Sequence, residues 1–346
     1  MKTLDPAREF EFAAAFIVLN TYDSVVTQKS ADDLNTFVPA LAKSWTITPD
    51  GKEYTFVLRD DVKFAGGNPL TADDVKFSLL RLKNLKGNPS WMMDPLKDVQ
   101  VVDPHTVKTI MNDSFGDWVA VLAGPNSGIQ DSKLVMQHNG SAADDAGKTD
   151  KADEFLDQNS AGSGPFILKG WQKNKVINLE RNPNYWQAAP KLAKVEIRDV
   201  NSPATQKLQV ENGDVDIALN LTPDLVDPLT NNPNVKVLPG QSLDNLYMGM
   251  TVDPALNPNL AKKEVRQAIR AAIDYDGILA LTNNTAVRSL AVFSVGILGM
   301  IQADADRMNP KTDLNRAKEL MSAAGLSGGF SFPLDYGTGP SPVGIS

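Results

Sequence analysis

Two hydrophobic periods alternate along this chain, and their alternation restricts the fold more than any other feature. From Glu53 to Leu58, apolar and polar residues alternate with the period of two that is typical of a half-buried strand. Asp50-Gly51 just before it is a turn pair, so Ser44–Thr48 is expected to pair with this strand as a hairpin. Strand patterns and helix patterns interleave in this way to the end of the chain, which predicts an α/β or mixed α+β fold.

The helices are predicted from their start and stop signals. The Thr71 hydroxyl can cap the first turn of one helix, with Asp74 three residues further on. Its buried stripe is expected to be Val75, Leu79 and Leu82. Another helix is expected at Pro203–Asn212, and a later one begins after Asp313 and ends at Gly325.

Further short strands are predicted between and after these helices. They are Val99–Val102, Thr106–Met111, Phe166–Leu168, Val176–Glu180, Lys194–Arg198, Asp216–Leu221, Val235–Leu238 and Leu246–Val252. The apolar stretch before Asn20 is expected to form a strand or a helix that leads to a polar turn. A short helix is expected after this turn.

Composition excludes several classes of function. The net charge of −8 disfavours binding to a phosphate backbone, so we expect no nucleic-acid partner. The chain has no cysteine, which excludes a thiol nucleophile and a thiolate metal site. The only histidines, His105 and His138, do not have metal-ligand spacing, and no Gly-x-Ser-x-Gly motif is present. We therefore expect no catalytic residues, no metal site and no cofactor.

A series of motifs in a fixed order spans most of the chain. The motifs are Leu4–Pro6, Tyr22–Ser24, Pro39–Trp45, Pro49–Phe56, Leu58–Phe64, Gly67–Val75, Gly162–Phe166, Leu179–Trp186, Asn212–Ala218 and Val265–Ile269. This series resembles the family 5 extracellular solute-binding proteins, the dipeptide and oligopeptide-binding components of ABC importers. Each motif is weak alone, and their common order carries the resemblance.

The resemblance implies a two-lobe fold of the periplasmic-binding-protein type II kind (cluster C), with an extra subdomain inserted in the first lobe. Residues 1–45 and 172–245 would form the main part of the first lobe, and residues 46–171 the inserted subdomain. Residues 246–346 would form an incomplete second lobe, because members of the family are usually longer. Val287–Ile301 is more apolar than the loop expected there, and could pack in a core, form an exposed patch or make an oligomer contact.

A ligand would bind between the lobes, where concave sites favour small molecules. The candidate ligand-binding residues are Asn20, Thr21, Tyr22, Trp91, Asn126 in the Gly124–Gly128 loop, Asn245 and Tyr247. Core packing is the alternative for each aromatic residue. The acidic group that holds the ligand amine in this family has no counterpart that can be assigned here. Gly162–Pro165 has the composition of a phosphate loop but lacks the following Lys-Ser/Thr, so a tight turn is expected.

The expected function is delivery of a short peptide to an ABC transporter permease by closure of two lobes around it. The protein would be a monomer in the periplasm, or on the cell surface if lipid-anchored, and a signal peptide is absent from the sequence. Within the same fold, the alternatives are binding of a sugar, an opine-like compound or a metal chelate. A sensor or chaperone without a transporter and a hydrolytic enzyme are the alternatives from other classes.

Overall fold

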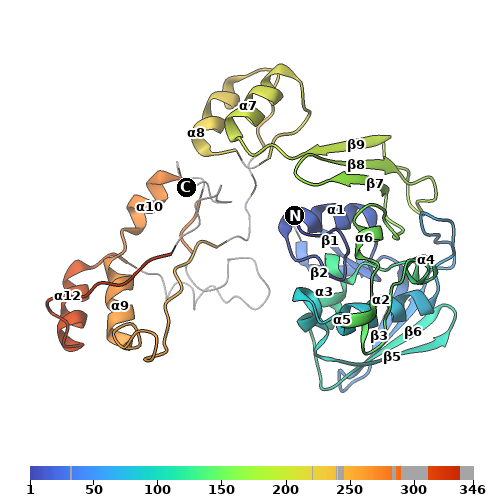
Figure 1. The fold of residues 1–346 in the computed structure, drawn as a ribbon, viewed down its shortest axis with the longest axis horizontal. Helices are drawn as coiled ribbons and strands as arrows, with labels where there is room; N and C mark the ends of the chain where they lie inside the picture. Colours follow the sequence, from blue (N-terminus) through green and yellow to red (C-terminus); the bar gives the residue numbers. More distant parts are fainter. Residues whose placement is uncertain are drawn as a thin grey trace. The chain divides into compact units, whose positions relative to one another are not determined.

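The computed structural model describes residues 1–31, 33–219, 221–238, 240, 245–282, 286–289 and 311–335. Contacts divide the chain into two compact units, Met1–Asp199 and Val200–Ser346. Each unit is described by itself (Figure 1). Among the described residues, no helix has both the length and the hydropathy required to cross a membrane.

The first unit contains all the strands of the described residues, and helices lie in both units. The strands are β1 (Val26–Ser30), β2 (Asp33–Pro39), β3 (Ala42–Ile47), β4 (Glu53–Leu58), β5 (Leu96–Asp103), β6 (Thr106–Met111), β7 (Phe166–Gln172), β8 (Val176–Arg181) and β9 (Lys194–Arg198). The α-helices of this unit are α1 (Phe12–Thr21), α2 (Ala72–Asn84), α3 (Trp118–Leu122), α4 (Ser132–Gln137), α5 (Ala146–Thr149) and α6 (Asp153–Leu156), with 3-10 helices η1 (Asn88–Met93) and η2 (Pro125–Ser127).

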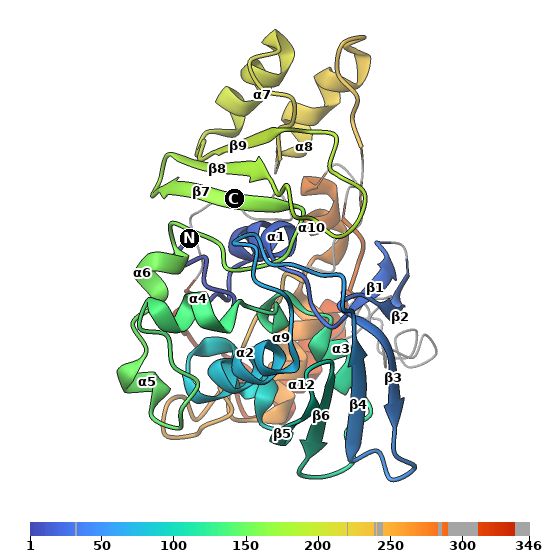
Figure 2. The same ribbon diagram turned by 90° about the vertical axis from the view of Figure 1, so that its right-hand side faces the viewer.

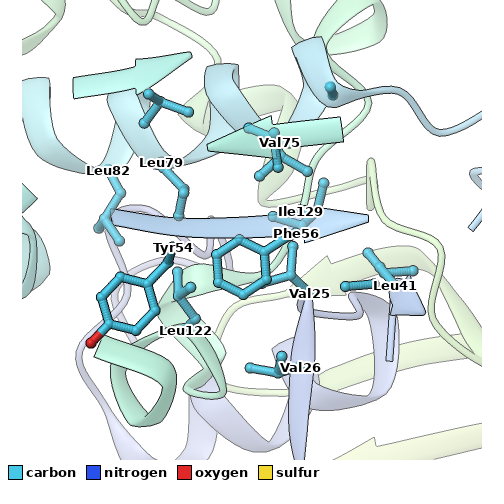
Figure 3. Close-up of a cluster of buried hydrophobic side chains, with 14 of the residues drawn as sticks. Val25, Val26, Leu41, Tyr54, Phe56, Val75, Leu79, Leu82, Leu122 and Ile129 are labelled. Atoms are coloured by element: carbon cyan, nitrogen blue, oxygen red, sulfur yellow. The ribbon is translucent and has the colours of Figure 1, made fainter. Parts of the chain in front are cut away.

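The main core of the first unit lies on an antiparallel sheet with strand order β3-β4-β6-β5. The predicted hairpin is confirmed, because β3 pairs with β4 across the turn at Gly51, whose φ is +66°. The predicted cap is also confirmed, since Thr71 and Asp74 form a capping box at the start of α2. Figure 3 shows side chains of α2 and β4 in the resulting buried cluster. The labelled members from these two elements are Val75, Leu79, Leu82, Tyr54 and Phe56.

A second, smaller core joins α1 to the antiparallel sheet β7-β8-β9 (Figure 2). Ala14 and Ile17 of α1 pack there with Leu168 and Leu179 of the sheet. The stretch before Asn20 therefore forms a helix, one of the two expected alternatives. The short helix expected after the polar turn is wrong, because residues 26–30 form β1, which pairs antiparallel with β2. Pairing with β2 satisfies the backbone of this segment without a helix.

A buried cluster of charges ties the N-terminus to α2. The Arg81 guanidinium, with its side chain fully buried, donates hydrogen bonds to Asp5, Asp150 and Gln130. Arg8 also contacts Asp150, with its Nη2 3.0 Å from Oδ1. Burial alone would raise the pKa of the Asp150 carboxyl, but the hydrogen bonds and charge of Arg81, with hydrogen bonds from the Ser141 amide and Arg8, together outweigh burial and lower it. This network fixes the Leu4–Pro6 motif onto α2.

The described part of the second unit contains helices, turns and segments without regular secondary structure. The helices among these residues are α7 (Pro203–Asn212), α8 (Pro223–Val226), η3 (Asp227–Asn231), α9 (Lys263–Ala272), α10 (Tyr275–Leu281) and α12 (Leu314–Ala323). The predicted signals are confirmed at α7, which ends at Gly213 with φ +76°, and at α12, where Asp313 accepts a hydrogen bond from the Arg316 amide. Ala268 of α9 packs with Ala317 and Leu320 of α12 in a small core.

Three of the predicted strands are wrong. The described residues of Asp216–Leu221, Val235–Leu238 and Leu246–Val252 lie in neither strands nor helices. A strand requires a neighbour for its backbone N–H and C=O groups. The described part of the second unit contains no strand that could pair with these segments. Some of their apolar residues are exposed, for example Ile217 at 74% and Leu246 at 62%.

The lobe boundaries predicted from the sequence divide the chain differently from the two compact units. Ala7 and Val25 pack in the same core as residues of the proposed inserted subdomain 46–171. The lobe boundaries, including the incomplete second lobe at 246–346, stay a prediction. Of the apolar Val287–Ile301 stretch, Val287 is exposed, and residues 290–301 lie outside the described residues.

Candidate functional site

Tyr22 lies at the point where α1 ends and the chain turns toward β1. Its ring is buried in a cluster with Val18 and Phe77. Its hydroxyl accepts a hydrogen bond from the Ala161 amide at 3.0 Å. Burial raises the pKa of Tyr22 above its usual value. The adjacent Thr21 is also buried, and its hydroxyl donates to the Ile17 carbonyl at 3.0 Å.

The Gly162–Pro165 motif packs directly against these two residues. A Cβ atom on Gly162 would lie 2.2 Å from the Thr21 carbonyl oxygen, and one on Gly164 would lie 2.6 Å from the Thr21 carbonyl carbon. The Gly164 amide donates to the Thr21 carbonyl at 3.2 Å. The glycines are required here because two backbones approach closely. This geometry fits the tight turn expected from the sequence.

Asp23 connects the same turn to the motif at Leu179–Trp186. Its Oδ2 accepts hydrogen bonds from the Ser163 hydroxyl at 2.8 Å and from the Trp186 indole N–H at 2.9 Å. Burial raises the pKa of the Asp23 carboxyl, and these two hydrogen bonds oppose part of that increase. The Arg59 guanidinium lies 4.6 Å from the centre of the Trp186 ring. Burial, together with the charge of Asp23, raises the pKa of Tyr185 to about 12.

Asn126 lies in η2 and is buried. Its side-chain amide donates to the Pro6 carbonyl at 3.1 Å and to the Glu9 carbonyl at 2.7 Å. It also donates to the Glu9 carboxylate at 3.1 Å. Burial raises the pKa of Glu9. Asn126 therefore holds the loop that precedes α1.

Asn20 and Trp91 are more accessible members of the predicted set in the first unit. Asn20 is half-buried on α1, and its side-chain amide donates to the Phe16 carbonyl at 2.8 Å. Trp91 lies in η1 with 60% of its surface exposed, while its neighbours Ser90 and Met93 are buried. Trp91 is therefore not a core residue of the first unit.

Asn245 and Tyr247 belong to the second unit. Asn245 is half-buried, and Tyr247 is 84% exposed in a segment without regular secondary structure. The segment that follows borders a hollow of about 320 Å³ within this unit, lined by Met248, Met250, Leu260, Phe332 and Leu334 among others. Two of the residues that line this hollow, Met248 and Met250, follow Tyr247 directly in the sequence.

The structure brings Thr21 and Tyr22 together with residues that the predicted set omits. Asp23, Ser163 and Trp186 meet beside them from segments up to 163 residues apart. The sequence did contain a signal, since all three lie in motifs that carry the family resemblance. The described residues include no group of three or more His, Asp or Glu side chains arranged to hold a metal ion.

Comparison with known proteins assigns the family. The sequence profile described as "Bacterial extracellular solute-binding proteins, family 5 Middle" matches residues 36–342. The chain belongs to this family, and the resemblance found in the sequence is confirmed. The predicted α/β fold of a periplasmic binding protein is confirmed with it, because the structure also matches solved binding proteins.

Two curated relatives and one solved structure show the extent of the similarity. The chain is 34% identical over 282 residues to the "Probable D,D-dipeptide-binding periplasmic protein DdpA" of Escherichia coli K12, covering 80% of this chain and 52% of that protein. It is 31% identical over 268 residues to "Di/tripeptide-binding protein 1" of Pseudomonas aeruginosa UCBPP-PA14, covering 70% of this chain and 47% of the relative. The structure of AgaA from A. tumefacien R10 in complex with agropinic acid superposes with a TM-score of 0.74 at 26% identity, covering 94% of this chain and 62% of that one. The chain thus spans about half the length of the curated relatives it matches.

Proposed function

We propose that this chain acts in an extracytoplasmic solute-binding protein that delivers a short peptide to the permease of an ABC importer. The observation that carries the proposal is the 34% identity to DdpA, whose name is "Probable D,D-dipeptide-binding periplasmic protein", across 80% of the chain. The second curated relative binds di- and tripeptides by its name. The ligand would be held by closure of two lobes. A ligand that contacts both lobes favours the closed state, because some of these contacts exist only in that state.

A pocket for many short peptides recognises what they share. This is a charged amine, a carboxylate and the amide groups, which favour charge-assisted hydrogen bonds and bridging water. Among the predicted site residues, Trp91 and Tyr247 are exposed and Asn20 and Asn245 are partly exposed. We assign direct ligand contact to these four residues.

Thr21, Tyr22 and Asn126 act on the ligand indirectly in this proposal. Their side chains are buried and already make hydrogen bonds within the first unit. They would fix the shape of the backbone that faces the ligand. For such a buried group, giving up one of these hydrogen bonds in order to contact the ligand would cost free energy.

The proposal extends to location and partners. The DdpA relative is periplasmic by its name, and the same location, in the periplasm or on the cell surface through a lipid anchor, is proposed here. We propose, as part of the same role, that the protein binds its ligand as a monomer. It would neither bind nucleic acid nor convert the ligand chemically. The net charge of −8 supports the absence of a nucleic-acid partner.

Titration calorimetry with a panel of solutes tests the proposal. The panel contains D-alanyl-D-alanine, L-alanyl-L-alanine, L-trialanine and agropinic acid, with native mass spectrometry to establish the stoichiometry. We expect a 1:1 complex with at least one of the peptides. Tyr247→Ala should weaken it about tenfold or more, equivalent to ~1.4 kcal/mol. Leu238→Ala is the matched control, because Leu238 is 74% exposed in the same unit.

The result also separates the alternatives. Binding of agropinic acid without peptide binding would support the ligand class of the AgaA relative instead. Chromatography of each solute after prolonged incubation detects hydrolysis, and turnover would contradict a role in binding only. Absence of binding to every peptide in the panel would contradict the proposed ligand class.

A further inference from the structure

Asparagine is followed by glycine twice in the sequence, at Asn139-Gly140 and at Asn212-Gly213. In such a pair the backbone nitrogen of the glycine can approach the side-chain amide of the asparagine without hindrance from a Cβ atom. Attack of this nitrogen on the amide carbon forms a cyclic succinimide and expels ammonia. Water then opens the succinimide to aspartate or isoaspartate. The same deamidation chemistry is available at both pairs, and the local structure decides which of them reacts.

The Asn139-Gly140 pair is held on both sides, although the Asn139 side chain is exposed. The Gly140 amide donates to the Val135 carbonyl at 2.9 Å, and the Asn139 carbonyl accepts from the Lys151 amide at 2.9 Å. A Cβ atom on Gly140 would lie only 2.3 Å from Cγ1 of the buried Val135. The attacking nitrogen is therefore engaged in a hydrogen bond and closely packed, so the reaction requires local opening of this turn.

The Asn212-Gly213 pair lies at the end of α7, and both residues are exposed. A Cβ atom on Gly213 would meet no atom within 4 Å, so the backbone here has room to rotate. The Gly213 amide donates to the Val210 carbonyl at 3.3 Å, compared with 2.9 Å for the corresponding bond of Gly140. The longer distance lies outside the usual range for an N–H to oxygen hydrogen bond, so this nitrogen is held less firmly.

The fold itself keeps a glycine in this exposed pair. Gly213 has a φ of +76°, the left-handed conformation in which a helix ends most readily at glycine. We propose that Asn212 is a site of spontaneous deamidation through a succinimide, and that the structure around Gly140 protects Asn139 from the same reaction. The site takes no ligand, so its chemistry is independent of the solute that the protein binds.

The product would disturb the end of α7. Deamidation places a negative charge between Glu211 and Asp214, at the C-terminal end of the helix, where the helix dipole disfavours an anion. Isoaspartate also adds a carbon atom to the backbone next to Gly213. The Asp214 amide donates to the Gln209 carbonyl at 2.8 Å across this point, so the longer backbone would strain the bond that closes the helix.

Ageing of the chain in a mildly alkaline buffer tests the proposal, once with the native protein and once in guanidinium chloride. Peptide mapping by mass spectrometry measures the rate of deamidation at Asn139 and at Asn212. The ratio of the native to the denatured rate isolates the effect of the structure at each pair. Labelling with an isoaspartyl methyltransferase detects isoaspartate, which reports the succinimide route. In Asn212→Gln, the longer side chain disfavours the cyclic imide, and Asn139 remains as an internal reference.

We expect the structure to slow the reaction at Asn139 about tenfold or more, and the reaction at Asn212 by no more than about threefold, because only the first requires opening of a packed turn. Asn212→Gln should remove isoaspartate from the peptide that contains residue 212 and leave the reaction at Asn139 unchanged. Equal native-to-denatured ratios at the two pairs, or stronger protection of Asn212, would overturn the proposal. Aspartate without isoaspartate at residue 212 would indicate direct hydrolysis and would also overturn it.

Discussion

Replacement of Arg81 by methionine should strongly destabilise the first unit. Arg81 donates five hydrogen bonds to Asp5, Asp150 and Gln130, at distances between 2.7 and 3.1 Å. The side chains of Arg81, Asp5 and Asp150 are fully buried. Arg81→Met would leave both carboxylates in the interior, with Arg8 as their remaining cationic neighbour.

The expected loss is about 3–5 kcal/mol, the usual cost of removing one partner from a buried ion pair. Whole domains are stable by only about 5–15 kcal/mol, so the variant should unfold at much lower denaturant concentration. Lys43→Met is the matched control. Lys43 and Asp60 are also 2.7 Å apart, but their side chains are 47% and 65% exposed. Their pair should contribute no more than about 1 kcal/mol.

Urea unfolding followed by circular dichroism measures both variants. The pH dependence provides a second test. Because folding lowers the pKa of Asp150, its contribution in the unchanged protein is present above the unfolded pKa and is lost as the pH falls through the folded pKa. In Arg81→Met, acidification neutralises the buried carboxylates, so the difference between the two proteins should shrink at low pH. Equal effects of Arg81→Met and Lys43→Met at neutral pH would refute the reasoning.

The turn at Tyr22 gives two further predictions. Gly162→Ala would bring a Cβ atom to 2.2 Å from the Thr21 carbonyl, and we expect a loss of about 1–3 kcal/mol in the free energy of unfolding from overpacking. Gly116→Ala, with no atom within 4 Å of the added Cβ, is the control, and equal thermal stability of both variants would contradict the steric argument. The stability of the Asp23→Asn variant relative to the unchanged protein should increase with pH. The increase should occur between the unfolded-state pKa of 3.8 and the raised pKa of Asp23 in the folded protein. The reason is that the buried Asp23 loses its proton less readily than the unfolded chain does. A difference in unfolding free energy that stays constant with pH would contradict the raised pKa.

Local signals predicted much of the first unit. The strand at Lys194–Arg198 forms with the predicted bounds, and the hairpin turn at Gly51 forms between β3 and β4. Thr71 and Asp74 cap α2 because the hydrogen bonds that favour this cap join residues three apart. Such features depend on neighbours in the sequence, so a single chain is enough to predict them.

The errors occur where structure depends on a distant partner. Leu246–Val252 alternates like a strand, but it has no neighbouring strand among the described residues of its unit. The short helix expected after the polar turn is instead β1, because β2 offers an edge to pair with. Hydrophobic period alone cannot decide between these outcomes, since it shows which side chains can be buried but not against what.

The candidate site shows the same division. Tyr22 and Asn126 were selected from the sequence as ligand contacts, and the structure places both in buried hydrogen bonds within the first unit. Beside Tyr22, the Asp23 carboxylate accepts hydrogen bonds from Ser163 and Trp186. No spacing in the sequence indicates that these three residues meet. A motif that marks a family can therefore record the packing of its scaffold as readily as its contact with ligand.

This distinction also determines how ligand choice can vary on this fold. The relatives named above carry names or titles with solutes as different as di- and tripeptides and agropinic acid. A change at Gly162 or Asp23 would disturb backbone packing and buried hydrogen bonds, so it alters stability before it alters specificity. Exposed side chains such as Trp91 and Tyr247 can change without breaking a buried contact in their own unit. Ligand specificity in this chain is therefore expected to reside in its accessible aromatic and amide side chains, and the buried turn at Tyr22 to keep the same geometry whichever solute is bound.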